Sequence, residues 1–162
     1  MSYNIQLKNA IDLYVDNLLS KNYTLKDINL PHFLKSIQRE MEQIDSNIAR
    51  NKSSFENWRE ICSVAFQCAE IIDRNINKSN FCEILCYKHK RYGTQNLIKR
   101  GEYGILVRLD DKISRAENLI VSEENDIVES LADTFLDIAG YAIQAIGMIE
   151  GWFYENLEDE NL

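Results

Sequence analysis

The sequence has very few residues that break helices. Among its 162 residues there are one proline and six glycines, and long β-branched runs of alternating polarity are absent. The apolar residues instead recur at intervals of three and four. The sequence therefore predicts an all-α fold, a helical bundle.

Long apolar runs and basic blocks are absent as well. No apolar run approaches the roughly 20 residues that span a membrane, and the first residues lack the basic start and cleavage site of a signal peptide, so we expect a cytoplasmic protein. The net charge of -8 argues against duplex DNA and membranes as partners. Nucleotides remain compatible with this charge, because carboxylates can recruit divalent cations that hold phosphates.

The four cysteines form no CxxC pair. Reduced and mostly buried thiols are the usual state of such residues. Cys82, Cys86 and His89 share one face of a predicted helix, at i, i+4 and i+7, so part of a metal site is the alternative interpretation.

Periodicity predicts six helices, over about 3–19, 31–50, 53–76, 81–92, 103–120 and 126–154. Ser53 with Glu56 has the spacing of a capping box for the third helix, and Asn80 with Glu83 repeats this spacing for the fourth. Residues 92–104, YGTQNLIKRGEYG, are predicted to form a loop, and loops of this kind often line sites.

The fifth predicted helix is amphipathic. Its polar stripe, at i, i+3, i+7 and i+10 with a lysine at the edge, consists of Arg108, Asp111, Arg115, Asn118 and Lys112. The predicted buried side consists of Ile105, Leu109, Ile113, Ala116 and Ile120.

The sixth predicted helix carries a column of carboxylates, Glu129, Asp133 and Asp137, at i, i+4 and i+8. Like charges stacked in this way repel one another. The residues opposite them are Leu131, Phe135, Ile138, Ala142 and Ile146. We expect the two helices to form a hairpin in which the two polar stripes face each other.

Two interpretations of the facing stripes stay open. In the first, they form ion pairs across the hairpin or face water, as most charged helix faces do. In the second, Glu129, Asp133 and Asp137 hold Mg²⁺, and the ion together with Arg108, Lys112 and Arg115 holds the phosphates of a nucleotide.

Three segments together resemble the nucleotide-modification-associated domain 1 family: YKHKRYG, GILVRLDDKISRAENL and ESLADTFLDIAGYAI. Members of that family carry a KxxDYG-like element, an RLxDKxxRxxNL helix and an ExxxDxxxDxAxYA helix. The resemblance covers about residues 81–149. The family is in turn similar to the all-α MazG-type nucleoside-triphosphate pyrophosphohydrolases, which use Mg²⁺ to produce a monophosphate and pyrophosphate.

The resemblance implies a function and a set of site residues. It implies a MazG-like nucleotide-handling domain over 79–154, with residues 1–78 as a helical extension packed on its core and 155–162 as an acidic tail. Glu129, Asp133 and Asp137 become candidate catalytic residues and ligands of Mg²⁺, or of Mn²⁺. The candidates for nucleotide binding are Tyr92, Arg108, Asp111, Lys112, Arg115 and Asn118.

Three functions follow as hypotheses. The first is a Mg²⁺-dependent pyrophosphohydrolase acting on (deoxy)nucleoside triphosphates. The second is a binder of a nucleotide or a nucleotide-derived signal without catalysis, which is favoured by the absence of the EExxE helix of MazG-type enzymes and by Arg91 in place of the aspartate of DYG. The third is a helical interaction protein with structural ion pairs. The long apolar helices also predict a homo-oligomer.

Overall fold

The computed structural model describes residues 2–16, 25–92, 99–122 and 127–154, with side chains from Ser130 onward in the last range. This part of the chain is helical and contains no strand, so the prediction of an all-α helical bundle is confirmed. The elements are α1 (Tyr3–Tyr14), η1 (Leu25–Asp27), α2 (Leu30–Ala49), α3 (Phe55–Ile72), α4 (Lys78–Tyr92), α6 (Gly101–Val121), α7 (Ile127–Glu150) and η2 (Trp152–Tyr154).

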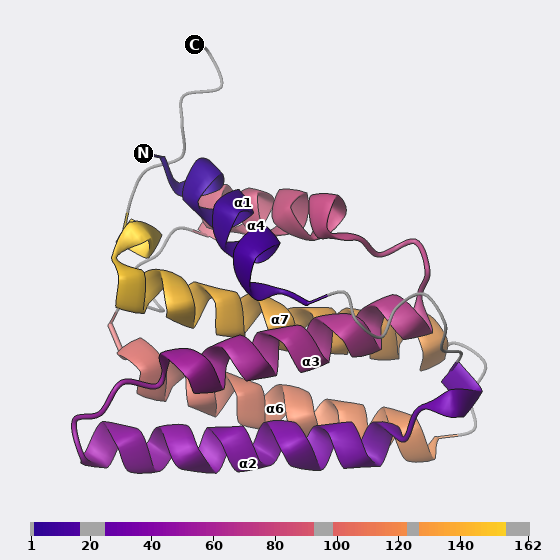
Figure 1. The fold of residues 1–162 in the computed structure, drawn as a ribbon. Coiled ribbons are helices and arrows are strands. Elements are labelled where there is room, and N and C mark those ends of the chain that lie inside the picture. The colour runs from indigo at the N-terminus through magenta and orange to yellow at the C-terminus, as the bar shows by residue number, and fades with distance from the viewer. Residues whose placement is uncertain (1, 17–24, 93–98, 123–126, 155–162) are drawn as a thin grey trace.

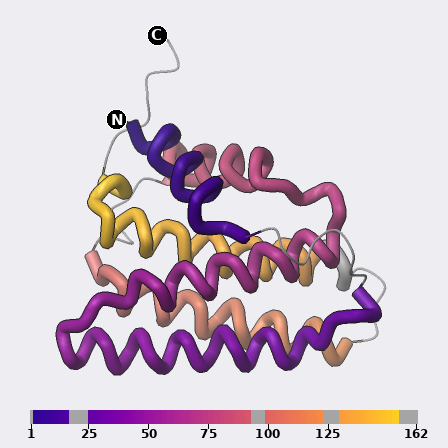
Figure 2. Tube along the Cα trace, in the orientation of Figure 1, coloured from indigo at the N-terminus to yellow at the C-terminus, as the bar shows by residue number. Residues whose placement is uncertain are grey.

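The helices form three layers (Figure 1). Helices α3 and α7 lie side by side in the middle layer, α2 and α6 lie below them, and α1 crosses α4 above them. The same path of the chain can be followed along the Cα tube in Figure 2. Helix α7 contacts helices of both outer layers, and it is the element around which the bundle is built.

The buried residues explain the central place of α7. From Leu131 to Gly147 every residue of α7 is buried except Asp133, Asp137 and Tyr141. The apolar side predicted for this helix is confirmed, since Leu131, Phe135, Ile138, Ala142 and Ile146 are all buried. One hydrophobic core joins these residues to those of α1, α2, α3, α4 and α6.

Helix α6 also has the predicted buried side. Ile105, Leu109, Ile113 and Ala116 are buried, while Ile120 near the end of the helix is half-buried. The helix begins at Gly101, two residues earlier than predicted, so the last part of the predicted loop 92–104 belongs to α6. Residues 93–98 and the connection 123–126 lie outside the described residues.

Three predicted helix ends are wrong, each because a local or tertiary contact ends the helix earlier. Helix α1 ends at Tyr14 because the Ser63 hydroxyl of α3 donates to the Tyr14 carbonyl oxygen and accepts from the N–H of Asp16. Helix α3 ends at Ile72 rather than 76, and the side chain of Asp73 accepts from the N–H of Asn75 in the turn that follows.

Helix α7 ends at Glu150 rather than 154. Gly151 has φ 88°, a left-handed backbone conformation that glycine adopts at little cost, and η2 then turns Trp152 and Phe153 into the core. The indole N–H of Trp152 donates to Glu150 Oε1 over 3.1 Å.

Both predicted capping boxes are wrong in detail. Ser54, rather than Ser53, precedes α3, and its buried hydroxyl accepts a hydrogen bond from Asn47 of α2 instead of capping the helix. At α4 the box lies three residues earlier than predicted, between Asn77 and Asn80. Each side-chain oxygen of this pair accepts from the other residue's backbone N–H at 2.9 Å.

In the described part of the chain, no helix combines the length and the apolar character needed to cross a membrane.

Candidate functional site

Asp137 of α7 forms ion pairs with one lysine of α4 and one lysine of α6, so charged groups of three helices meet at this residue. Its Oδ1 lies 3.1 Å from Lys88 Nζ of α4, and its Oδ2 lies 2.9 Å from Lys112 Nζ of α6. The three side chains are 27%, 42% and 30% exposed, respectively, so water still reaches the cluster. Pairs that are exposed to this extent contribute about 1 kcal/mol or less each to stability.

The Lys112–Asp137 pair is a contact between the two stripes that we predicted to face each other. It is also the kind of ion pair that the first interpretation of the stripes expects. Lys88 was not among the predicted site residues. It lies within the YKHKRYG segment, four residues before Tyr92 and three after Leu85, and this spacing places it on the helix face that lines the pocket.

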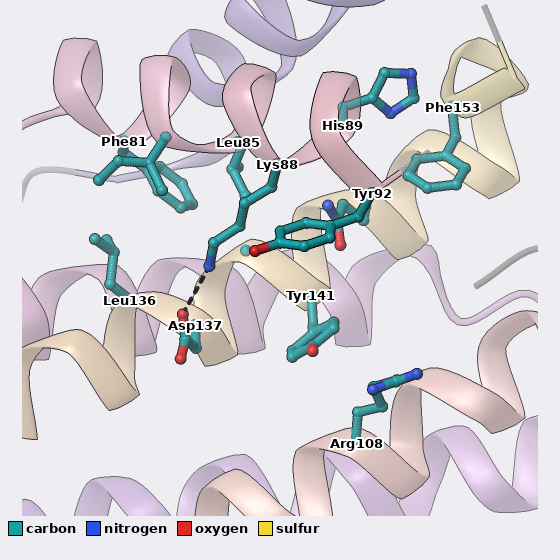
Figure 3. A pocket seen from close by; sticks show the side chains of 13 residues that line it. Phe81, Leu85, Lys88, His89, Tyr92, Arg108, Leu136, Asp137, Tyr141 and Phe153 are labelled. Carbon is teal, nitrogen blue, oxygen red and sulfur yellow. Dashed lines mark hydrogen bonds and ion pairs between the residues drawn. The ribbon is translucent and has the colours of Figure 1, made fainter. Parts of the chain in front are cut away.

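A pocket of about 300 Å³ opens beside this cluster, between α4, α6 and α7 (Figure 3). Its apolar lining includes Phe81, Leu85, Leu136 and Phe153. Gly140 lets α4 approach α7 closely at this point, since a Cβ there would lie 2.9 Å from Leu85 Cδ2. A pocket with an apolar floor and a few polar groups is typical of small-molecule sites.

The polar lining of the pocket is mainly cationic and aromatic. It includes Lys88, Arg108, Asp137, Tyr92 and Tyr141, and Figure 3 shows Lys88 reaching from α4 toward Asp137, with the ring of Tyr92 beside it. Lys112 adds a third cation through its contact with Asp137. Two ammonium groups thus contact one carboxylate, and Arg108 adds a further positive charge to the lining, although the chain as a whole has a net charge of -8.

The predicted nucleotide-binding residues divide into two groups. Tyr92 and Arg108 line the pocket, and Lys112 contacts it through Asp137. Asp111, Arg115 and Asn118 lie on the exposed side of α6 and are not part of the pocket lining. The straight stripe expected on this helix is therefore divided by the packing of α6 against α7.

The carboxylate column is also divided. Asp137 is engaged by two lysines, whereas Asp133, one turn earlier on α7, is exposed. Glu129 belongs to α7, but its side chain is not described. Among the residues that are described, no three His, Cys, Asp or Glu side chains lie close enough together to hold a metal ion.

Cys82, Cys86 and His89 lie on α4, where His89 also lines the pocket, whereas Cys62 and Cys68 belong to α3. Cys62 and Cys68 are buried, and burial raises the pKa of Cys68 to about 12. Cys82 and Cys86 are half-buried, and a hydrogen bond between the two thiols lowers the pKa of Cys82 and raises that of Cys86. His89 does not join them in a metal-binding group, since its ring stacks on Tyr3 at 3.6 Å.

Comparison with known proteins identifies no relative: no family model matches the chain, and no curated protein or solved structure is significantly similar to it. The resemblance to the nucleotide-modification-associated domain 1 family therefore stays a prediction that rests on the three sequence segments.

Proposed function

We propose that this protein binds a nucleotide, or a nucleotide-derived small molecule, in the pocket between α4, α6 and α7. The observation that carries the proposal is the charge of the lining: Lys88 and Arg108 carry two positive charges against the single carboxylate of Asp137, which Lys112 also contacts. Phosphate groups are the natural partners of such clusters, because charge-assisted hydrogen bonds to phosphate oxygens are strong. The apolar floor and the rings of Tyr92 and Tyr141 supply surfaces for the base and the sugar.

Binding can be measured by titration calorimetry with nucleoside mono- and triphosphates, with and without Mg²⁺. We expect Lys88→Met and Arg108→Met each to weaken binding about tenfold or more, because a hydrogen bond to a charged group contributes about 1.5–3 kcal/mol. Lys35→Met and Arg39→Met are matched controls, since both residues are exposed on α2 and neither lines the pocket. If the unmutated protein binds none of the nucleotides, the proposal is wrong.

We also propose a second candidate function, Mg²⁺-dependent hydrolysis of a (deoxy)nucleoside triphosphate to a monophosphate and pyrophosphate. It rests on the family resemblance and on Asp133, an exposed carboxylate one turn from Asp137. Asp133, Asp137 and Glu129 would hold Mg²⁺ or Mn²⁺, which would supply Lewis-acid activation of water and phosphate. Lys88 and Lys112 occupy both oxygens of Asp137, so an ion bound there must displace at least one ammonium group.

Pyrophosphate release in the presence of Mg²⁺ or Mn²⁺ separates the two functions. A hydrolase releases pyrophosphate, and its Asp133→Asn variant still binds the triphosphate but turns it over at least about 100-fold more slowly. A binder without catalysis yields the intact ligand after denaturation. A chain that neither binds nor hydrolyses nucleotides would support the third hypothesis, in which the ion pairs are structural.

The homo-oligomer and the cytoplasmic location belong to the same proposal. The length and apolar character of the helices support the first, and the four free thiols support a reducing compartment. Sedimentation velocity measures the first, and a chain that sediments as a monomer at micromolar concentration would contradict it.

A further inference from the structure

The pocket has a second polar end, at Gln144. Gln144 follows Asp137 by seven residues on α7, so the two lie on the same face of the helix and about 10 Å apart along its axis. Both line the pocket. This separation is comparable to the length of a nucleoside monophosphate from its phosphate to the edge of its base.

Gln144 is an unusual residue for its position, because it is only 7% exposed and lies among apolar residues of the central helix. Its amide carries two N–H donors and an oxygen acceptor, and buried groups of this kind nearly always have hydrogen-bond partners. If Gln144 were a structural core residue, its amide would form its hydrogen bonds with other groups of the protein. Because Gln144 also lines the pocket, a bound small molecule is the alternative source of hydrogen-bond partners.

The neighbour of Gln144 within the protein is the Tyr3 hydroxyl, which is sealed from solvent. No described group reaches ordinary hydrogen-bond distance and geometry from this hydroxyl. Burial raises the pKa of Tyr3 above its ordinary value, and the nearby Gln144 amide partly opposes this rise. The Tyr3 hydroxyl can engage at most one group of the amide, so the remaining donor and acceptor capacity is left for the pocket.

The surroundings of Gln144 are aromatic. The Tyr3 ring stacks on His89 at 3.6 Å and an interplanar angle of 8°, and Phe153 meets His89 edge to face at 5.6 Å. His89 and Phe153 both line the pocket. This end can therefore hold a flat, largely apolar ring while offering one amide to its edge, whereas the ammonium groups of Lys88 and Lys112 lie at the end near Asp137.

We propose that Gln144 hydrogen-bonds the edge of the base of a nucleotide whose phosphate lies at Lys88. An amide presents a donor beside an acceptor, and this pair complements N6 and N7 of adenine and, equally, O6 and N1 of guanine. This inference rests on the proposed nucleotide function and adds the residue that recognises the base in the same site.

The test compares AMP, GMP and ribose 5-phosphate, which has no base, by calorimetry on the full chain. We expect the unmutated protein to bind AMP or GMP about tenfold or more tightly than ribose 5-phosphate, since a site built to hydrogen-bond one group rejects the ligand that lacks it. In Gln144→Leu this preference should fall below about threefold, and the Kd of ribose 5-phosphate should stay unchanged. Lys88→Met should weaken all three ligands.

Gln67→Leu is the matched control, because Gln67 is a buried glutamine of α3, 6% exposed, that does not line the pocket. It should leave the preference for the nucleotides over ribose 5-phosphate intact. Far-UV circular dichroism checks the folding of each variant, and Gln144→Met, which keeps the length of the side chain, replaces Gln144→Leu if the latter does not fold.

The outcomes are distinct. A preference for AMP or GMP over ribose 5-phosphate that survives in Gln144→Leu, or the absence of this preference in the unmutated protein, overturns this inference and leaves nucleotide binding in place. Failure of AMP, GMP and ribose 5-phosphate alike to bind the unmutated protein overturns the proposed function and this inference together.

Discussion

At the scale of the residue, position in the bundle determines what each charged side chain does. Asp133 and Asp137 lie one turn apart on α7 and have the same chemistry, but Asp133 is exposed and Asp137 lies between two lysines. Two ammonium groups would repel each other if they met without a carboxylate between them. Asp137 thus allows α4 and α6 to bring cations to one point, and the pocket opens there.

Gly147 shows how closely a single residue is constrained by packing. A Cβ at this position would lie 2.9 Å from the six-membered ring of Trp152, and the rigid indole cannot give way by changing one bond angle. We expect Gly147→Ala to lower the free energy of unfolding by about 1–2 kcal/mol, because overpacking outweighs the better helix propensity of alanine. Urea denaturation followed by circular dichroism measures the change.

The Trp152→Leu background is the control for that prediction. Once the indole is removed, Gly147→Ala should be neutral or should stabilise the protein by up to about 1 kcal/mol, since the gain in helix propensity then remains alone. An equal loss of stability in both backgrounds would show that the contact with Trp152 is not the cause.

At the scale of the element, the ends of helices depend on short-range pairs that compete with tertiary contacts. Asn77 and Asn80 form a reciprocal capping pair at the start of α4. Ser54 has the same capability at the start of α3, but its hydroxyl bonds Asn47 instead. Asn47 also donates to Asn57. The Ser54 hydroxyl is thus part of a hydrogen-bonded group centred on Asn47 of α2 and does not cap α3.

The Asn77–Asn80 pair leads to a prediction for α4. Asn77→Ala should lower the free energy of unfolding by about 1 kcal/mol, the usual loss when a capping side chain is removed. Ser79→Ala, an exposed substitution in the same turn, is the control and should change stability by less than about 0.5 kcal/mol. Thermal and urea unfolding of both variants measure the difference, and equal effects would rule out a specific cap.

At the scale of the whole molecule, α3 and α7 join the two parts of the chain. Helix α3 belongs to the segment 1–78 that we predict to be an extension, and α7 belongs to the predicted nucleotide-handling part 79–154. The two helices lie side by side in the middle layer, and one core includes residues of both. The indole N–H of Trp58 in α3 also donates to Glu102 of α6 over 2.6 Å.

This shared core predicts one cooperative unfolding transition. Trp58 and Trp152 are buried and report on the two parts separately, so Trp152→Phe and Trp58→Phe each leave one fluorescent probe. In each variant, the fluorescence transition in urea should coincide with the circular dichroism transition of the same variant. Transitions that separate by part would mean that residues 1–78 and 79–154 unfold as independent units.

The sequence alone predicted much of this fold and part of the candidate site. The buried sides of α6 and α7 follow from the 3.6-residue period, because a helix fixes which side chains share a face whatever it packs against. Arg108 and Asp137 were predicted from their types and spacing and Tyr92 from the family resemblance, and all three line one pocket. Lys88 and Gln144 were missed, since neither belongs to a polar stripe.

Periodicity by itself thus determined that the chain is helical and which faces of the helices are apolar. The tertiary structure alone decided where the helices end, which charges meet and where a pocket remains between them. The physical reason is range: helix faces follow from backbone geometry over one or two turns, whereas Lys88, Lys112 and Asp137 are brought together from helices that are far apart in sequence. Their contact exists only once α4 and α6 have packed against α7.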